Sequence, residues 1–207
     1  MRLPVILFLP LFLVFNPLLS AQKPEFGLGL GASHSFISAT SSSPGQDDFT
    51  LNTETGFGFS LLIAGRLELA RRFHLATYPA IHFQEQRLEL TRNRNEQTVL
   101  PDYHGLAVSV PLRLEYTFGV VNTRPIVSAG IGHFRSMISE LEITDFTDNA
   151  SFTYTEVTAG LVHDYTRFTV RPELSYRRSI SKPFTGPGLD GANWSSLELR
   201  LLIYGRR

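Results

Sequence analysis

The chain has 207 residues, with 19 Lys and Arg against 19 Asp and Glu and no cysteine. This length allows one domain, and the balanced charge gives no basic footprint for nucleic acid. The absence of cysteine excludes disulfide bonds and a lipid-modified N-terminal cysteine, so the chain must be held by backbone ladders, packing or a bilayer.

Residues 1–21 have the pattern of a secretory signal peptide. Arg2 supplies a minimal positive region, residues 3–15 form an apolar run, and small residues end at Ala21, after which we expect cleavage. A membrane anchor helix is the alternative, but prolines at positions 4, 10 and 17 make the apolar span short and broken. We therefore expect an exported domain over residues 22–207.

The first half of this domain shows period-two hydrophobicity. Residues 103–116 are the clearest case, with Leu112 and Leu114 on one face and Arg113 and Glu115 on the other. Such alternation is typical of a strand with two unlike faces. The first four expected strands span residues 25–37, 56–69, a segment from 73 whose alternation fades past 85, and 103–116.

The second half continues the pattern. The remaining expected strands span residues 124–137, 151–163, 168–176 and 194–204. In the third of these, Phe168 and Val170 face one way, and Arg171 and Glu173 face the other. In a membrane barrel the apolar face would contact lipid and the charged face would line the interior.

The connections alternate between long and short. The long polar loops are expected at 38–55, 91–102, 138–150 and 181–193, and the short turns at 70–72, 117–123 and 164–167. Eight strands with this alternation predict an all-β fold, an eight-stranded antiparallel up-and-down transmembrane β-barrel of the bacterial outer membrane, with both termini and the short turns in the periplasm. A soluble sandwich is the alternative, but it predicts no such alternation.

Aromatic residues beside the short turns support this placement in a bilayer. Membrane proteins carry aromatic girdles at the two interfaces. The residues expected to form the periplasmic girdle are Phe73, Tyr116, Phe118, Tyr165, Phe168 and Tyr204.

Charged residues recur on the inward faces of the expected strands. An eight-stranded barrel is just wide enough for its own side chains or one small ligand, so a general diffusion channel is not expected. Unpaired charge there would be costly, which favours mutual pairing over the alternative of a proton or ion relay. The expected lumen network consists of Arg66, Glu68, Arg113, Glu115, Glu156, Arg171, Glu173, Glu198 and Arg200.

No catalytic or metal-binding pattern stands out. The sequence contains no His-x-Ser pair that would share a strand face, and His163 lies beside a short turn, on the wrong side for a lipid-modifying site. His74 and His82 share a face but are about 26 Å apart along an extended strand, too far to bind one metal ion. We therefore expect no catalytic residue, cofactor or metal.

Several segments resemble the PorT family of outer-membrane barrels from the Bacteroidetes group. They are residues 56–63, 73–90, 110–116, 122–125, 129–130 and 156–179. The resemblance lies in the order of strand patterns and turn residues. It implies an outer-membrane barrel associated with type nine protein secretion, and with gliding in motile relatives, and it implies no catalytic residues.

The functional hypothesis is thus a non-enzymatic accessory of protein export, whose partners are outer-membrane lipid and secretion-machinery proteins at the periplasmic turns. Arginines expected at that end are Arg71, Arg72, Arg167, Arg206 and Arg207, which would meet lipid headgroups or a protein. A structural or adhesive barrel with partner-binding outer loops is one alternative. A lipid-modifying enzyme is another.

Overall fold

The computed structural model describes residues 24–41, 49–92, 96–99, 103–138, 147–148, 151–185 and 189–205. The expected signal peptide at 1–21 lies outside these residues. Among the residues described, none belongs to a helix with the length and apolarity needed to cross a membrane.

The described chain consists of strands. The long strands are β1 (Glu25–Ser41), β2 (Phe49–Ala70), β6 (Tyr103–Thr117), β7 (Thr123–Ile138), β9 (Ser151–Asp164), β10 (Phe168–Ser179) and β12 (Leu189–Gly205). The remaining barrel strand is divided into β3 (Phe73–Thr77) and β4 (Ala80–Arg92). We call each of these eight barrel strands a wall. Three short strands, β5 (Glu96–Val99), β8 (Thr147–Asp148) and β11 (Phe184–Thr185), lie outside the walls.

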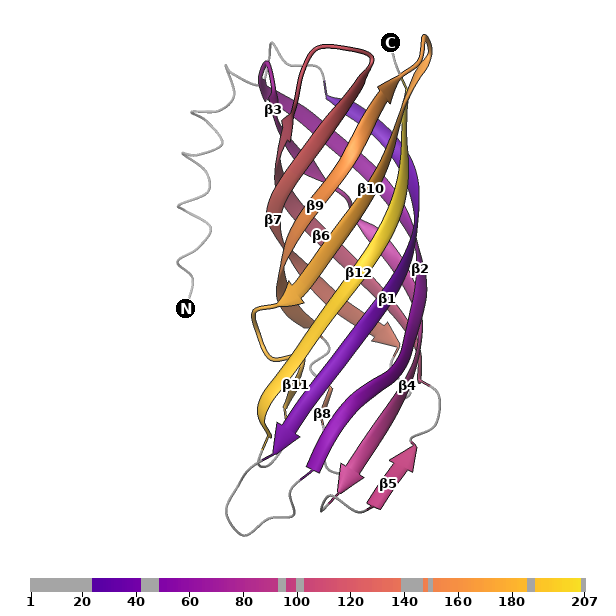
Figure 1. Cartoon of the computed structure of the whole chain (residues 1–207), viewed down its shortest axis with the longest axis vertical. Coiled ribbons are helices and arrows are strands. Elements are labelled where there is room, and N and C mark those ends of the chain that lie inside the picture. Colours follow the sequence, from indigo (N-terminus) through magenta and orange to yellow (C-terminus); the bar gives the residue numbers. More distant parts are fainter. Residues whose placement is uncertain are drawn as a thin grey trace.

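The walls close into an eight-stranded antiparallel barrel, as the sequence predicted. β1 pairs with β2 on one side and with β12 on the other, so that Gly27 lies opposite both Ala64 and Tyr204. Figure 1 shows the short turns and the end of β12 at the upper end of the barrel, and β5, β8 and β11 at the lower end. We call these the short-turn end and the long-loop end.

The wall formed by β3 and β4 is interrupted at Tyr78 and Pro79. Pro79 has no N–H to donate to the ladder, and pairing with β6 stops after Thr77 opposite Leu112 and resumes at Ala80 opposite Ser109. The register is unchanged across this gap. On the other side the Ile63 amide donates to the Pro79 carbonyl at 2.9 Å, so the wall stays attached to β2.

Side chains alternate between the two faces of every wall. In β6, Leu112 and Leu114 are exposed on the outside, while Arg113 and Glu115 are buried inside. The same alternation leaves an apolar belt around the barrel, in which side chains such as Leu28 are up to 68% exposed. Contiguous apolar surface of this extent marks a membrane-facing surface.

The strands are longer than the sequence indicated at the long-loop end. β1 continues to Ser41 and β2 begins at Phe49, where a loop over residues 38–55 was expected. Similarly, β4 extends to Arg92, β5 lies within the expected loop 91–102, and β12 begins at Leu189. The sequence of these extensions is rich in polar residues, so they leave no clear period-two hydrophobic signal.

Five of the six expected girdle residues lie on the outer surface near the short turns. Three pairs of their rings are in contact. The ring centroids are 4.9 Å apart in Phe73 and Tyr116, 4.8 Å in Tyr116 and Phe118, and 4.7 Å in Tyr165 and Phe168. The expectation for Tyr204 is wrong, because this side chain is only 2% exposed and points inward. Its position in β12 has the inward parity, since its neighbour Ile203 is exposed.

Candidate functional site: the lumen and its two ends

The lumen is filled by a balanced set of charged side chains. Four arginines and four glutamates are each at most 1% exposed. These buried charges, which we call the lumen network, are Arg113, Arg171, Arg177, Arg200, Glu115, Glu156, Glu173 and Glu198. Charges removed from water to this degree require partners with close geometry.

The half of the lumen network nearer the short turns is organised on Glu115. The Glu115 carboxylate lies 3.0 Å from Arg171 Nη2, 3.3 Å from Arg113 Nη2 and 3.2 Å from Arg66 Nε. The Tyr78 hydroxyl also donates a hydrogen bond to it. One carboxylate therefore neutralises parts of three guanidinium groups from three different strands.

The other half is organised on Glu156 and Glu198. Arg200 bridges them, with Nη1 at 2.6 Å from Glu156 and Nε at 2.7 Å from Glu198. Arg177 Nη2 lies 2.6 Å from Glu198 Oε2. Arg113 Nη1 reaches Glu156 Oε1 at 3.1 Å, and this contact joins the two halves into one network.

The two-residue period of the β-strand explains how this network forms. Arg113 and Glu115, Arg171 and Glu173, and Glu198 and Arg200 are pairs two residues apart on single strands, so both members face inward. Each of these three strands thus supplies an acid and a base together. Pairs such as Arg171 with Glu115 and Arg113 with Glu156 then join strands that are not neighbours in the barrel wall.

The structure places eight of the nine expected lumen charges inside the barrel, counting Arg66 near the mouth. Glu68 was expected in the lumen network, but it is exposed and has no ion pair with that network in the described part of the chain. Its parity is inward, but it lies where β2 runs out beyond the filled lumen. Arg177 was missed because the expected strand stopped at Tyr176, one residue before this inward position.

Aromatic rings close the lumen towards the long-loop end. Phe134, Phe152 and Trp194 pack with ring centroids 4.9 to 5.5 Å apart. The ring centroids of Tyr154 and Trp194 are 6.1 Å apart, and those of His82 and Phe134 are 5.7 Å apart. We call Phe134, Phe152, Tyr154 and Trp194 the aromatic cap. The cap and the lumen network together fill the interior, as expected for a barrel of this size.

A histidine and a serine meet beneath the aromatic cap. His82 Nε2 lies 2.7 Å from Ser109 Oγ, and both side chains are 1% exposed. This pair has no signature within a single strand, because it is a diagonal contact between β4 and β6. Within the residues described, no acid is seen to hydrogen-bond to the His82 ring, so a complete triad is not formed.

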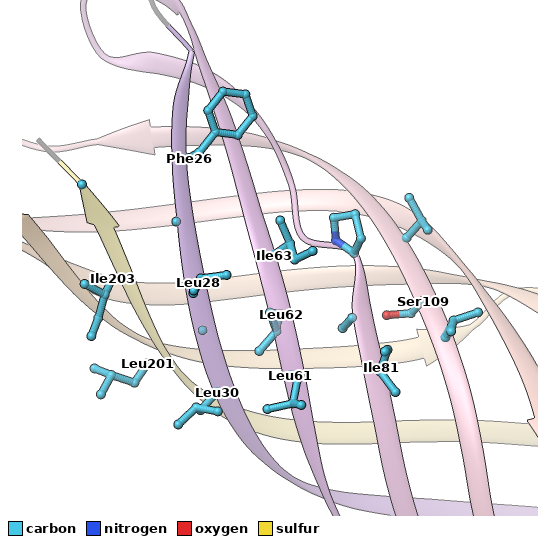
Figure 2. Close-up of a pocket in the computed structure, with 17 residues that line it drawn as sticks. Phe26, Leu28, Leu30, Leu61, Leu62, Ile63, Ile81, Ser109, Leu201 and Ile203 are labelled. Atoms are coloured by element: carbon cyan, nitrogen blue, oxygen red, sulfur yellow. The ribbon is translucent and has the colours of Figure 1, made fainter. Parts of the chain in front are cut away.

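An apolar groove of about 1060 Å³ lies on the outer wall. Figure 2 shows its lining from β1, β2, β4 and β12, which includes Phe26, Leu28, Leu30, Leu61, Ile63, Ile81, Leu201 and Ile203. Ser109 and Ala80 also border it, beside the Pro79 interruption. The chemistry that matches this lining is a hydrocarbon chain, so the groove belongs to the lipid-facing belt.

Metal binding finds no support in the side chains that the structure describes, because no group of three or more His, Cys, Asp or Glu could hold an ion there. His74 lies near the short turns, whereas His82 lies under the aromatic cap. The two histidines therefore do not converge on one site.

The closed barrel, its apolar belt and its filled lumen define the class of the small outer-membrane β-barrels. No family model and no curated protein sequence matches the chain. Among solved structures it is similar to Neisserial surface protein A, with a TM-score of 0.55 and 15% identity over 89% of this chain and 99% of that one. It is also similar to OprG from Pseudomonas aeruginosa, with a TM-score of 0.50 and 11% identity over 87% of this chain and 92% of that one. These similarities establish the fold.

Proposed function

We propose that this chain is a non-enzymatic accessory of protein export in the bacterial outer membrane, similar to the PorT barrels of type nine secretion. The observation that carries the proposal is the filled interior. The lumen network and the aromatic cap occupy the space through which a solute would pass, so the barrel acts through its ends. The order of strand and turn residues, which resembles that of the PorT family, supports the link to export.

The proposed orientation places the short-turn end in the periplasm. Bacterial barrels have short periplasmic turns and longer loops outside. The aromatic girdle near Phe73 and Phe168 supports an interface at this end, and the extended polar strands at the other end suit the aqueous exterior. Partner proteins of the export machinery would then meet the short turns.

Exposed arginines supply the contact surface at the short-turn end. Arg71 and Arg72 form the turn between β2 and β3, and Arg167 lies in the turn before β10. Arg206 and Arg207 lie outside the described residues. Basic turns at a membrane interface first contact lipid headgroups, and a periplasmic protein with an acidic surface would bind the same residues.

Deletion in the host tests the proposal. We expect type nine cargo to accumulate in the periplasm, while permeability of the outer membrane to small solutes stays nearly unchanged. Complementation with the wild-type chain should restore secretion, and complementation with Arg71→Glu/Arg72→Glu should restore barrel levels but not secretion. Normal cargo secretion in the deletion strain would defeat the export role.

An adhesive barrel is a second candidate, favoured by the edge of β5. In the described part of the sheet β5 pairs with β4 alone, which leaves a strand edge at the long-loop end. Such an edge can add a strand from a partner. Loss of host-surface or matrix binding in the deletion strain, with normal secretion, would favour this candidate.

A lipid-acting enzyme is a third candidate, favoured by the hydrogen bond between His82 and Ser109 and by the groove that Ser109 borders. Its weakness is burial, because a substrate carbonyl has no access to a serine that is 1% exposed. Lipid analysis separates the cases. Altered lipid A or phospholipid acylation in a strain carrying Ser109→Ala, with normal secretion, would promote the enzyme.

A further inference from the structure

A cavity of about 320 Å³ opens at the short-turn end of the barrel. We call it the mouth cavity. Its lining comes from the ends of all eight walls, from Glu25 in β1 to Tyr204 in β12, so it lies around the axis of the barrel. Arg171 of the lumen network forms part of its inner surface.

Positive charge predominates in the mouth cavity. Five arginines and three acidic residues line it: Arg66, Arg71, Arg72, Arg124, Arg171, Glu25, Glu68 and Asp164. Arg66 pairs with Glu25 at 3.1 Å, and Arg124 pairs with Asp164. Among the described residues Arg71 and Arg72 have no ion pair, and Arg72 Nη1 donates only to the Tyr116 hydroxyl at 3.3 Å.

Four side chains that line the mouth cavity also carry a buried nitrogen atom without a hydrogen-bond partner among the described residues. These atoms are Arg66 Nε, Arg124 Nε, Arg171 Nε and His74 Nδ1. The His74 side chain is only 9% exposed, and Arg171 is fully buried. Arg66 Nε lies 3.2 Å from Glu115, but without hydrogen-bond geometry. Leaving buried donors unsatisfied costs free energy that a bound acceptor would recover.

We propose that the mouth cavity is a binding site for a phosphate group, entered from the short-turn side of the membrane. Guanidinium groups arranged around an axis present donors from several directions, which suits the oxygens of a tetrahedral oxyanion. Arg71 and Arg72 supply positive charge against a single carboxylate that is unpaired in the described lining, Glu68, and the lining keeps an excess of positive charge. His74 in its Nδ1–H tautomer supplies a neutral donor. The volume accommodates a phosphate ester of a small solute as well as the free ion.

Two sources could supply this phosphate group. A soluble phosphate or phosphate ester would enter along the axis, whereas a lipid headgroup would have to bend inward over a turn from the surrounding membrane. Both present the same oxygens to the same arginines. The site itself does not depend on the export role proposed above, because it rests on the lining of the mouth cavity.

Titration of inorganic phosphate into the purified full-length barrel in detergent tests the site, with binding measured by calorimetry at low salt. We expect saturable binding with one site per barrel, weakened at least tenfold in Arg71→Gln/Arg72→Gln and weakened in His74→Phe. Arg135→Gln/Arg178→Gln removes the same charge from exposed positions that do not line the cavity, and it should bind like the wild type. Absence of saturable binding, or equal weakening in both double variants, would overturn the proposal.

Nanodiscs distinguish the two sources. In nanodiscs of zwitterionic lipid, phosphate affinity equal to that in detergent supports the soluble source. If adding phosphatidylglycerol to the nanodiscs weakens phosphate binding in the wild type, and the Arg71→Gln/Arg72→Gln barrel shows no such competition, the same site takes a lipid headgroup. Thermal unfolding of each variant checks that the barrels are intact, since Arg71 and Arg72 are exposed turn residues outside the lumen network.

Discussion

The guanidinium carbon of Arg113 lies 3.8 Å from the centroid of the Tyr78 ring. Tyr78 is at the interruption between β3 and β4, and its hydroxyl donates to Glu115, the partner of the same arginine. The Tyr204 hydroxyl in turn donates to the Tyr78 hydroxyl at 3.1 Å. The interior side chains thereby fasten the wall at the one place where the described ladder between β3–β4 and β6 is broken.

Tyr78 should therefore contribute more to stability than its hydrogen bonds alone. We expect Tyr78→Phe to lower the free energy of unfolding by about 1 to 2 kcal/mol, because it leaves the ring over Arg113 and removes a hydrogen bond to a charged group. Tyr78→Ala should cost about 3 to 5 kcal/mol through the added cavity. Urea unfolding of the barrel in lipid vesicles measures both, and equal losses would show that the ring contributes nothing.

Glu115 should be harder to replace than Arg171. Glu115→Gln leaves Arg66, Arg113 and Arg171 facing one another, so we expect a loss of about 3 to 5 kcal/mol. Arg171→Met leaves the carboxylate with two other arginines and should cost less.

Glu68→Gln is the matched control for Glu115→Gln, since Glu68 is exposed, and it should change stability by less than about 0.5 kcal/mol. Thermal and urea unfolding report the order of the three variants. If Glu115→Gln is as harmless as the control, the lumen network is hydrated enough to tolerate unpaired arginine.

Leu112 tests the outward face of β6. An arginine on the lipid face costs about 2 to 4 kcal/mol near the middle of the bilayer and about 0 to 1 kcal/mol near the interface. We expect the larger cost for Leu112→Arg and the smaller for Val121→Arg, in the turn before β7. Unfolding from vesicles gives both values, and the reverse order would mean that the membrane lies elsewhere on the barrel.

Trp194 tests whether the lumen is closed by more than one layer. Trp194→Ala opens the aromatic cap, and we expect it to destabilise the barrel by about 3 to 5 kcal/mol. Ion conductance in planar bilayers should nevertheless stay at the low level of the wild type, because the lumen network still fills the space beneath. A stable open channel in this variant would show that the cap alone closes the barrel.

Period-two alternation was sufficient to predict the closed barrel and most of its inward charges. Where apolar and polar residues alternate, as in Leu112 to Glu115, the pattern shows which face of the strand contacts lipid and which faces the lumen. The ends of the strands were harder to predict, because a stretch of polar pairs such as Asn52 opposite Glu89 resembles a loop in composition.

Contacts between strands could not be derived from the sequence, since they depend on register. The pairing of His82 with Ser109 requires β4 and β6 to be aligned so that Ala80 faces Ser109. A shift by one residue would turn one of the two side chains towards lipid. The misplacement of Tyr204 has a simpler origin, because its aromatic character suggested the girdle while its parity in β12 directs it inward.

The pairing of β1 with β12 also sets an order of events for biogenesis. The first strand finds one of its two neighbours only in the last strand, as in Gly27 opposite Tyr204, so the wall stays open until the chain is almost fully synthesised. Contacts that join the two ends of a sequence form slowly, because they must overcome the entropy of a very long loop. Until β12 is available to pair with β1, the apolar faces of the other strands have no closed barrel around them and need shielding from water.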